Sequence, residues 1–264
     1  MDLGIEGRVA LVTGGGRGIG RETAREFLQA GVKVMTCART GEQLERTCAE
    51  LRELTGGEIQ SRVVDMTKPA DIQAIIDATL STYGTIDILV NNAGTMYPGR
   101  FAELTDEGLQ TQLDTKLFGW LRAIRAVSPI MREKKWGRIV SLIGGAGKEP
   151  DPYMFGSAMT NSALLNMTKS LSTEFGPDNV LVNAVCPGWV ATDLWRRHAE
   201  GLRRELEVQT DEQARELAKK KNALGRMGKP EELASAIAFL CSERASYITG
   251  VSLNLDGGRL KGLW

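Results

Sequence analysis

The segment from residue 9 to residue 20, VALVTGGGRGIG, constrains the fold of this chain more than any other. A short apolar run leads into a glycine-rich turn, and an amphipathic pattern over residues 19–30 follows it. Gly14, Gly18 and Gly20 stand at the T-G-x-x-x-G-x-G spacing, which lets bare backbone approach a pyrophosphate at the N-terminus of the next helix. The segment therefore predicts a strand, a turn and a helix that together bind a nucleotide.

Short β-branched runs alternate with longer helical patterns along the rest of the chain. The runs are centred near Val9, Val34, Val63, Leu89, Val140 and Val182, and a last one covers residues 251–255. This alternation is typical of a parallel sheet with helices on both faces. The 264 residues, 42% of them hydrophobic, suffice for one sizeable core, and no linker-like stretch divides them. We expect a single α/β domain over residues 1–264, with a Rossmann-type doubly wound parallel sheet of about seven strands.

Composition narrows the partners and the location. The 33 Lys and Arg side chains balance 33 Asp and Glu side chains, so no bulk charge recruits nucleic acid or an anionic membrane. No apolar stretch is long enough to span a bilayer and no leader pattern opens the chain, which favours a cytoplasmic protein. Cys37, Cys48, Cys186 and Cys241 lack metal-ligand spacing, so we assign them to packing and expect no metal site.

Two arginines bear on the choice of dinucleotide. The second predicted strand ends at Ala38 and Arg39, where a protein that binds a free ribose 2′-hydroxyl would place an acidic residue. Arg39 and Arg17, which lies in the glycine turn, offer paired guanidinium groups for a 2′-phosphate instead. This favours NADP(H) over NAD(H). The alternative for Arg39 is a solvated residue at the start of the next helix.

The next helix and strand supply further expectations at the same edge of the sheet. Thr40 and Gln43 have the spacing of a capping box, which predicts that Thr40 caps a helix extending to about Thr55. Asp65 and Met66 follow the third strand, and we expect Asp65 to meet an adenine amino group. The alternative is that Asp65 caps the following helix.

Three further motifs follow the glycine turn in order: residues 91–94 (NNAG), residues 187–192 (PGWVAT) and the end segment 249–258. With the turn, they resemble the short-chain dehydrogenase/reductase family over nearly the whole chain. In relatives the NNAG turn stabilises the sheet and lines the adenosine site, while the Pro-Gly stretch surrounds the nicotinamide. The resemblance implies further cofactor contacts from Ile19, Asn91, Ala93, Gly94, Pro187, Gly188, Val190 and Thr192.

The resemblance does not extend to the residues that carry the family's chemistry. Relatives such as 3-oxoacyl-acyl-carrier-protein reductases use a tyrosine as proton donor, a lysine four residues later, a serine and an asparagine. Alignment through residues 168–171 (TKSL) places the tyrosine position at Ser157 and the lysine position at Asn161. The serine position falls on Gly144 and the asparagine position on Lys116. All four catalytic residues are therefore predicted to be replaced.

Two features suggest that a rebuilt site takes their place. Lys116 and Asn161 are exchanged relative to the family pattern, so an amine is expected to enter the pocket from the opposite wall; alternatively, Lys116 merely replaces a structural water. Tyr153 lies one helical turn before Ser157, and if the helix includes it, both side chains share a face. Ser157 donates a hydrogen bond but is too weak an acid to replace a phenol.

Hydrogen-bond donors such as Ser157 suit a substrate oxygen that must be polarised rather than protonated, as in reduction of an enoyl thioester. We therefore expect an NADP(H)-dependent oxidoreductase with a non-standard active site, acting on a carbonyl or an enoyl substrate. The alternatives are a redox-inactive subunit that pairs with an active relative, and a non-redox lyase of the same fold.

The charged segment 193–229 is predicted to form a helical cover over the substrate, as in relatives. Trp189 and Trp195 favour an apolar pocket wall and thus a hydrophobic or acyl-type substrate. A run of lysines such as residues 219–221 (KKK) is typical of a solvated face. The alternative is that it binds the phosphate of an acyl carrier. The resemblance also implies a homodimer or homotetramer, with contacts through the helices around Trp120 and Ser162.

Overall fold

The computed structural model describes residues 2–192, 195, 199, 203 and 208–262. Seven parallel strands form one sheet in the order β3-β2-β1-β4-β5-β6-β7. They are β1 (Val9–Thr13), β2 (Lys33–Ala38), β3 (Ile59–Val63), β4 (Ile88–Asn91), β5 (Gly137–Leu142), β6 (Val180–Pro187) and β7 (Ser252–Leu255). The strand order reverses between β1 and β4, which is where open α/β sheets bind their ligands.

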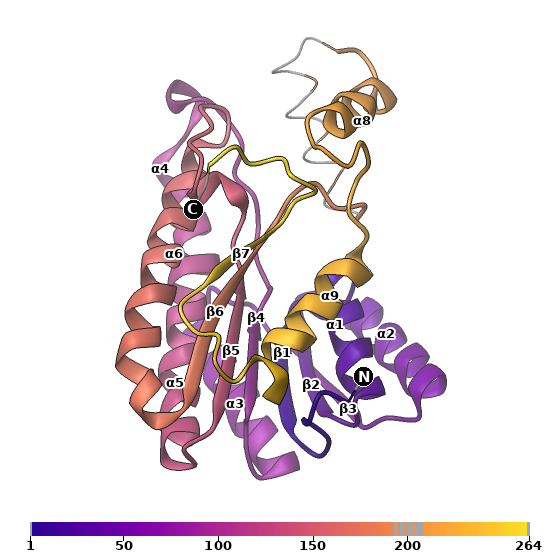
Figure 1. Ribbon diagram of the computed structural model, residues 1–264, viewed down its shortest axis with the longest axis vertical. Helices are drawn as coiled ribbons and strands as arrows, with labels where there is room; N and C mark the ends of the chain where they lie inside the picture. The colour runs from indigo at the N-terminus through magenta and orange to yellow at the C-terminus, as the bar shows by residue number, and fades with distance from the viewer. Residues whose placement is uncertain (1, 193–194, 196–198, 200–202, 204–207, 263–264) are drawn as a thin grey trace.

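Helices cover both faces of the sheet (Figure 1). One face packs on α1 (Gly18–Gln29), α2 (Gly41–Thr55) and α9 (Pro230–Leu240). The other packs on α3 (Pro69–Tyr83), α5 (Gly119–Glu133) and α6 (Phe155–Phe175). The prediction of a Rossmann-type doubly wound sheet is therefore confirmed.

The strands read as continuous apolar runs because both of their faces are buried. In β1, Ala10 and Val12 belong to the core under α1, α2 and α9, whereas Leu11 belongs to the core under α3 and α5. Every residue of β1 is buried. The strand that carries the glycine turn is thus held rigidly at the centre of the molecule.

Lys116, one of the predicted catalytic residues, lies in a continuous run of helical segments. The short helix α4 (Asp106–Gln112) continues through the π-helical segment η2 (Leu113–Phe118) directly into α5. A π-turn inserts extra backbone into a helix and shifts the side chains that follow, and such turns are frequent at functional sites. Lys116 lies within η2 and is buried.

Two helix starts differ in detail from the sequence-based expectations, although α2 begins after Thr40 and ends at Thr55 as predicted. Thr40 occupies the N-cap position of α2, but its side chain makes no capping hydrogen bond. Tyr153 lies before α6 rather than within it, since the helix begins at Phe155. The backbone carbonyl of Tyr153 accepts a hydrogen bond from the amide of Gly99 at 2.7 Å, and the adjoining Met154 forms a bridge to the same residue. Tyr153 and Met154 pair with the loop that contains Gly99, so α6 begins only at Phe155.

The predicted cover over residues 193–229 is described in part. Helix α8 (Asp211–Lys220) lies beyond the carboxyl edge of the sheet (Figure 1) and packs with Trp189, Trp195 and Met227 in a small separate apolar cluster. The remainder of the segment from 193 to 207, apart from residues 195, 199 and 203, lies outside the described residues.

Within the described part of the chain, no helix is long and apolar enough to cross a membrane. Among the same residues, no group of histidine, cysteine and carboxylate side chains is arranged to hold a metal ion. All four cysteines are buried with free thiols, as the packing interpretation predicts.

Candidate active site

Two adjoining pockets open at the carboxyl edge of the sheet. The first, here called the glycine-turn pocket, lies over the turn between β1 and α1 and extends past the ends of β2 and β3. The second, the α6 pocket, lies between the loop after β4, the α4 and η2 helices, and the start of α6. Both are lined by Ile19, Asn92 and Gly94, so they form one continuous cleft.

Glycine is required in the turn for two different reasons. Gly14 has a φ of +75°, a conformation that side chains rarely adopt. At Gly20 a Cβ would lie 2.3 Å from the carbonyl oxygen of Gly14 and 2.4 Å from Nδ2 of Asn92. No side chain caps the first turn of α1, an arrangement typical of helices whose N-terminal amides bind an anion. These features fit a phosphate cradle.

The far end of the glycine-turn pocket carries positive charge. Arg17 and Arg39 both line it, beside Thr40 and Gln43. Paired guanidinium groups suit a phosphate monoester, as the sequence predicts for NADP(H). Gln43, predicted as part of a capping box, thus lies in the pocket wall instead.

Asp65 lines the same pocket and does not cap a helix, since Lys68 holds the N-cap position of α3. Its Oδ1 accepts hydrogen bonds from the amide of Thr67 at 3.0 Å and from Thr67 Oγ1 at 2.8 Å. The amide of Thr67 contributes most to holding the pKa of Asp65 below its usual value. The carboxylate is thereby fixed in its ionised form at the edge of the pocket, where an amino group could bind it.

Most residues predicted to contact a cofactor line the cleft. They are Gly14, Arg17, Gly18, Ile19, Arg39, Asp65, Met66, Ala93, Gly94 and Thr192 in the glycine-turn pocket, and Pro187 and Gly188 in the α6 pocket. Gly20 lies under the turn rather than in the wall, and Val190 is buried in the core.

Asn91 does not line the cleft. It ends β4 fully buried, and its Nδ2 donates to Ser141 Oγ on β5 at 3.3 Å. The neighbouring Asn92, which sequence reasoning missed, lines both pockets, and its Nδ2 donates to the carbonyl oxygens of Thr13 and Gly14. Asn91 is the last residue of β4, whereas Asn92 begins the loop after the strand, which lines the cleft.

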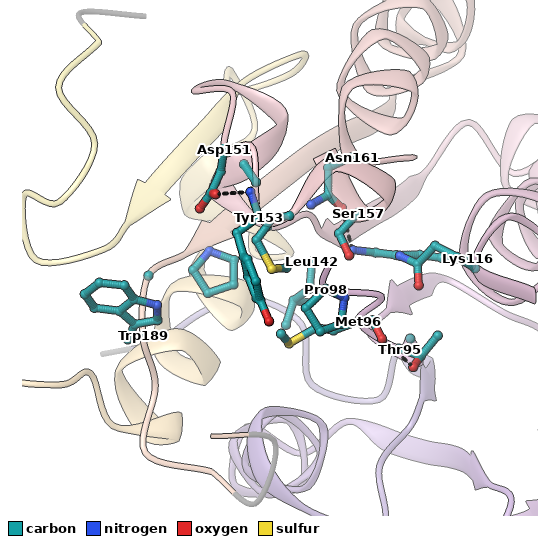
Figure 2. A pocket seen from close by; sticks show the side chains of 18 of the residues that line it. Thr95, Met96, Pro98, Lys116, Leu142, Asp151, Tyr153, Ser157, Asn161 and Trp189 are labelled. Atoms are coloured by element: carbon teal, nitrogen blue, oxygen red, sulfur yellow. Dashed lines mark hydrogen bonds between the residues drawn. The ribbon is translucent and has the colours of Figure 1, made fainter. Parts of the chain in front are cut away.

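The four predicted catalytic residues all line the α6 pocket. Figure 2 shows Lys116, Ser157 and Asn161 grouped together, with Tyr153 extending into the pocket between that group and Trp189. Lys116 Nζ donates a hydrogen bond of 2.7 Å to Asn161 Oδ1. The two side chains that are exchanged relative to the family pattern are therefore in direct contact.

Ser157 and Gly144 complete this polar group. Ser157 Oγ accepts a hydrogen bond of 3.0 Å from the amide of Tyr97, which leaves its hydroxyl proton to be donated elsewhere. A Cβ on Gly144 would lie 2.8 Å from Nδ2 of Asn161, so the absence of a side chain there makes room for the amide. The glycine at position 144 thus leaves the space that the Asn161 side chain occupies.

Burial changes the chemistry of Lys116. Its side chain is only 8% exposed, and desolvation lowers its pKa to about 8. No carboxylate among the described residues forms an ion pair with it. The nearest aromatic contact is the ring of Trp120, whose centroid lies 5.0 Å from Nζ. Lys116 is therefore an amine that exchanges its proton near neutral pH.

The pocket wall is both apolar and charged. Trp189 forms part of it, as predicted, and the guanidinium of Arg259 lies 4.6 Å from the Trp189 ring centroid. Asp151 and Lys221 also line the pocket. Trp195 packs behind Trp189 rather than in the wall.

A doubly wound sheet with a phosphate-binding glycine turn at its switch point, and a polar pocket beside it, defines a dinucleotide-binding protein of the Rossmann class. Residues 14–259 match the family model described as enoyl-(acyl carrier protein) reductase. The chain belongs to the short-chain dehydrogenase/reductase family.

Relatives and solved structures agree with this assignment. The 3-oxoacyl-[acyl-carrier-protein] reductase FabG of Salmonella typhimurium is 32% identical over 256 residues, which cover 97% of this chain and 98% of the relative. The structure of L-sorbose reductase from Gluconobacter frateurii, complexed with NADPH and L-sorbose, is 33% identical with a TM-score of 0.93 and covers 100% of both chains. A variant of actinorhodin polyketide ketoreductase with NADPH is 35% identical with a TM-score of 0.93, covering 97% of this chain and 98% of that chain.

Proposed function

We propose that this protein is an NADP(H)-dependent oxidoreductase that reduces a carbonyl or enoyl substrate with a rebuilt active site. The supporting observation is the contact between Lys116 Nζ and Asn161 Oδ1, inside a pocket that continues into the glycine-turn pocket. Lys116, Ser157, Asn161 and Tyr153 are the proposed catalytic residues. The first three stand at the family's asparagine, tyrosine and lysine positions, respectively.

The glycine turn and the arginines fit NADP(H). Gly14 and Gly18 would hold the pyrophosphate, Arg17 and Arg39 the 2′-phosphate, and Pro187 and Gly188 the nicotinamide end. Two of the similar structures contain NADPH, which supports the same choice. When bound, this cofactor supplies or accepts a hydride.

Lys116 is the proposed proton donor. An amine with a pKa of about 8 gives up its proton more readily than an ordinary lysine, yet it is largely protonated at neutral pH. Asn161 holds Nζ by its hydrogen bond and so fixes the direction of the donated proton. Ser157 would donate its hydroxyl proton in a hydrogen bond to the substrate oxygen, where negative charge develops.

Tyr153 has a more limited role in this proposal. It lies outside α6, so it does not share a helical face with Ser157 as expected, but its side chain still lines the pocket. Together with Met96 and Trp189 it would cover the substrate and exclude water from the reacting atoms.

The test is turnover and cofactor affinity measured in the same variants. Lys116→Met should lower kcat by about 10²- to 10⁴-fold, the usual contribution of a positioned acid. NADPH affinity should stay within about threefold, because Lys116 does not line the glycine-turn pocket. Lys33→Met, which removes an exposed lysine paired with Glu58, is the control and should keep full activity. Full activity in Lys116→Met would refute the role of Lys116.

Calorimetric titration with NADPH and NADH tests the cofactor. Tighter binding of NADPH, lost in Arg39→Ala, is the expected result. Binding of neither would favour a redox-inactive subunit pairing with an active relative, whereas binding without redox turnover of a consumed substrate would favour a non-redox lyase.

A further inference from the structure

Arg259 carries a positive charge in the wall of the α6 pocket that has no ionic partner among the described residues. It follows β7, lines the pocket and is half-buried. Within the described part of the chain, its guanidinium makes no hydrogen bond or ion pair, and none of its nitrogens is buried. Asp256, the acid nearest to it in sequence, is engaged elsewhere, because its two carboxylate oxygens accept hydrogen bonds from the amides of Gly258 and Leu260. The Arg259 guanidinium is therefore open to a ligand.

The ring of Trp189 holds this charge in the pocket wall. The guanidinium carbon of Arg259 lies over the ring, 4.6 Å from its centroid, and Trp189 itself is only 9% exposed. An arginine held over an aromatic ring keeps the edge of its guanidinium available for an acceptor. Figure 2 shows Trp189 across the pocket from Lys116 and Ser157, with Tyr153 between them. A substrate could thus place its reacting oxygen near Ser157 and a second group near Arg259.

The other charges of the pocket wall favour an anion as this second group. Lys221, which caps the C-terminus of α8, is exposed and lines the same pocket, as does the buried Lys116. Asp151 is the only acid that lines the pocket among the described residues, and its Oδ1 accepts a hydrogen bond of 2.9 Å from the amide of Tyr153. Three cationic side chains therefore share the wall with one acid, so an anionic ligand balances its charge.

A carboxylate is the anion that this arrangement suits. The guanidinium offers parallel N–H donors that match the two oxygens of a carboxylate. Met96, Met154 and Leu142 line the same pocket and suit a hydrocarbon chain that joins the carboxylate to the reacting carbonyl. In an acyl-carrier thioester, the whole pantetheine arm separates the phosphate from the acyl group, which would leave Arg259 beside an uncharged chain.

We propose that Arg259, assisted by Lys221, binds a carboxylate group of the substrate, and that the substrate is a free oxo acid rather than a neutral ketone or a carrier-bound acyl group. The inference rests on the proposed function for its reacting carbonyl. It adds a specificity-determining residue and gives the expected hydrophobic substrate an anionic end.

The test uses methyl ketone acids of increasing length, from 2-oxopropanoate to 7-oxooctanoate, so that the distance between carbonyl and carboxylate is varied. Binding of each acid to the NADP⁺-loaded protein is compared with binding of its methyl ester. At least one acid should bind at least about tenfold more tightly than its ester, because only the acid pairs with the guanidinium.

The variant Arg259→Met keeps an apolar stem beside Trp189 and removes the charge. The preference for the acid should vanish in it, while the affinity for the ester stays within about threefold. The matched control is Lys261→Met, which removes one positive charge at an exposed position outside the pocket wall and should retain the preference. If Arg259→Met does not fold, Arg259→Gln takes its place.

Several outcomes would overturn the proposal. Equal affinities of acid and ester across the series, or binding of no probe, would do so. A preference that survives in Arg259→Met but is lost in Lys116→Met would place the carboxylate at the amine instead. Equal losses of acid and ester binding in Arg259→Met would reduce Arg259 to a support for Trp189. Arg259-dependent binding of 4′-phosphopantetheine, with no acid preferred over its ester, would assign the charge to an acyl carrier.

The proposed function is tested separately by NADPH consumption. An Arg259-dependent preference for an acid, without consumption of NADPH, would refute the redox reaction and leave the carboxylate site standing. Consumption of NADPH at equal rates with acid and ester would support the redox reaction and overturn the carboxylate site.

Discussion

Burial of Lys116 favours its neutral amine. Burial lowers its pKa to about 8 from 10.5, and no described carboxylate compensates the charge of the protonated form. The same desolvation that weakens the ammonium also makes it a better acid. A single residue thus links the cost of burying a charge to the chemistry proposed for the pocket.

The pH dependence of turnover follows from this pKa. If protonated Lys116 is the donor, kcat for reduction should fall as pH rises through about 8, tenfold for each further pH unit. The measurement is kcat against pH from 6 to 10 at saturating NADPH. A profile that stays flat across pH 8 would contradict the assignment of the proton to Lys116.

Stability should change in the opposite sense. Between pH 8 and 10.5 the unfolded chain holds a proton on Lys116 that the folded chain has lost, so stability rises with pH across that window. Relative to Lys116→Met, the wild type should gain about 3 kcal/mol in free energy of unfolding over this range. Denaturant unfolding of both proteins at pH 7 and pH 10.5 measures the difference, and an equal pH response would show that the lysine is not desolvated.

Ser157 is the second residue with a predictable effect. Its oxygen is occupied by the amide of Tyr97, so its proton is available to a substrate oxygen. Ser157→Ala should lower kcat by about 10²- to 10³-fold, the usual effect of losing one oxyanion donor. Ser170→Ala, on an exposed part of the same helix, should be unaffected, and steady-state kinetics of both variants make the comparison.

At the scale of elements, the glycine turn packs closely against α1. Gly20→Ala would drive a Cβ into the carbonyl oxygen of Gly14 and into Asn92. We expect a lower melting temperature and a loss of at least tenfold in NADPH affinity, because the turn must shift. Gly228→Ala, where the nearest atom to a Cβ would lie 3.7 Å away, is the control and should leave both unchanged.

Strands and helix ends that are determined by their own residues could be predicted from the sequence. The strands are continuous apolar runs, and α2 and α3 end at Gly56 and Gly84, both left-handed. The start of α6 could not be predicted, because it depends on pairing between Tyr153 and Gly99. The capping box at Thr40 failed for a related reason: Gln43 lies in the pocket wall, not over the helix end.

Some residues of the candidate site could be predicted from the sequence, and others could not. The exchange of Lys116 and Asn161 could be read from the family pattern, and the two side chains do meet. Gln112, a buried residue at the end of α4 that also lines the α6 pocket, was not identified, since a glutamine on a short helix is usually exposed and nothing in its neighbours marks it as buried. Its spacing of four residues from Lys116 was the available signal.

At the scale of the whole molecule, the expected homodimer or homotetramer is still a prediction. Phe118 at the end of η2 is 40% exposed and Met159 on α6 is 44% exposed. Exposed apolar side chains on the long helices suit a subunit contact.

The shared wall of the two pockets has a kinetic consequence. Ile19, Asn92 and Gly94 line both, so an occupant of the glycine-turn pocket completes the boundary of the α6 pocket. The dinucleotide should therefore enter first and leave last. Initial-rate patterns would then be sequential and ordered, with NADP⁺ competitive against NADPH and the reduced product noncompetitive, and a saturating substrate would slow the escape of NADPH.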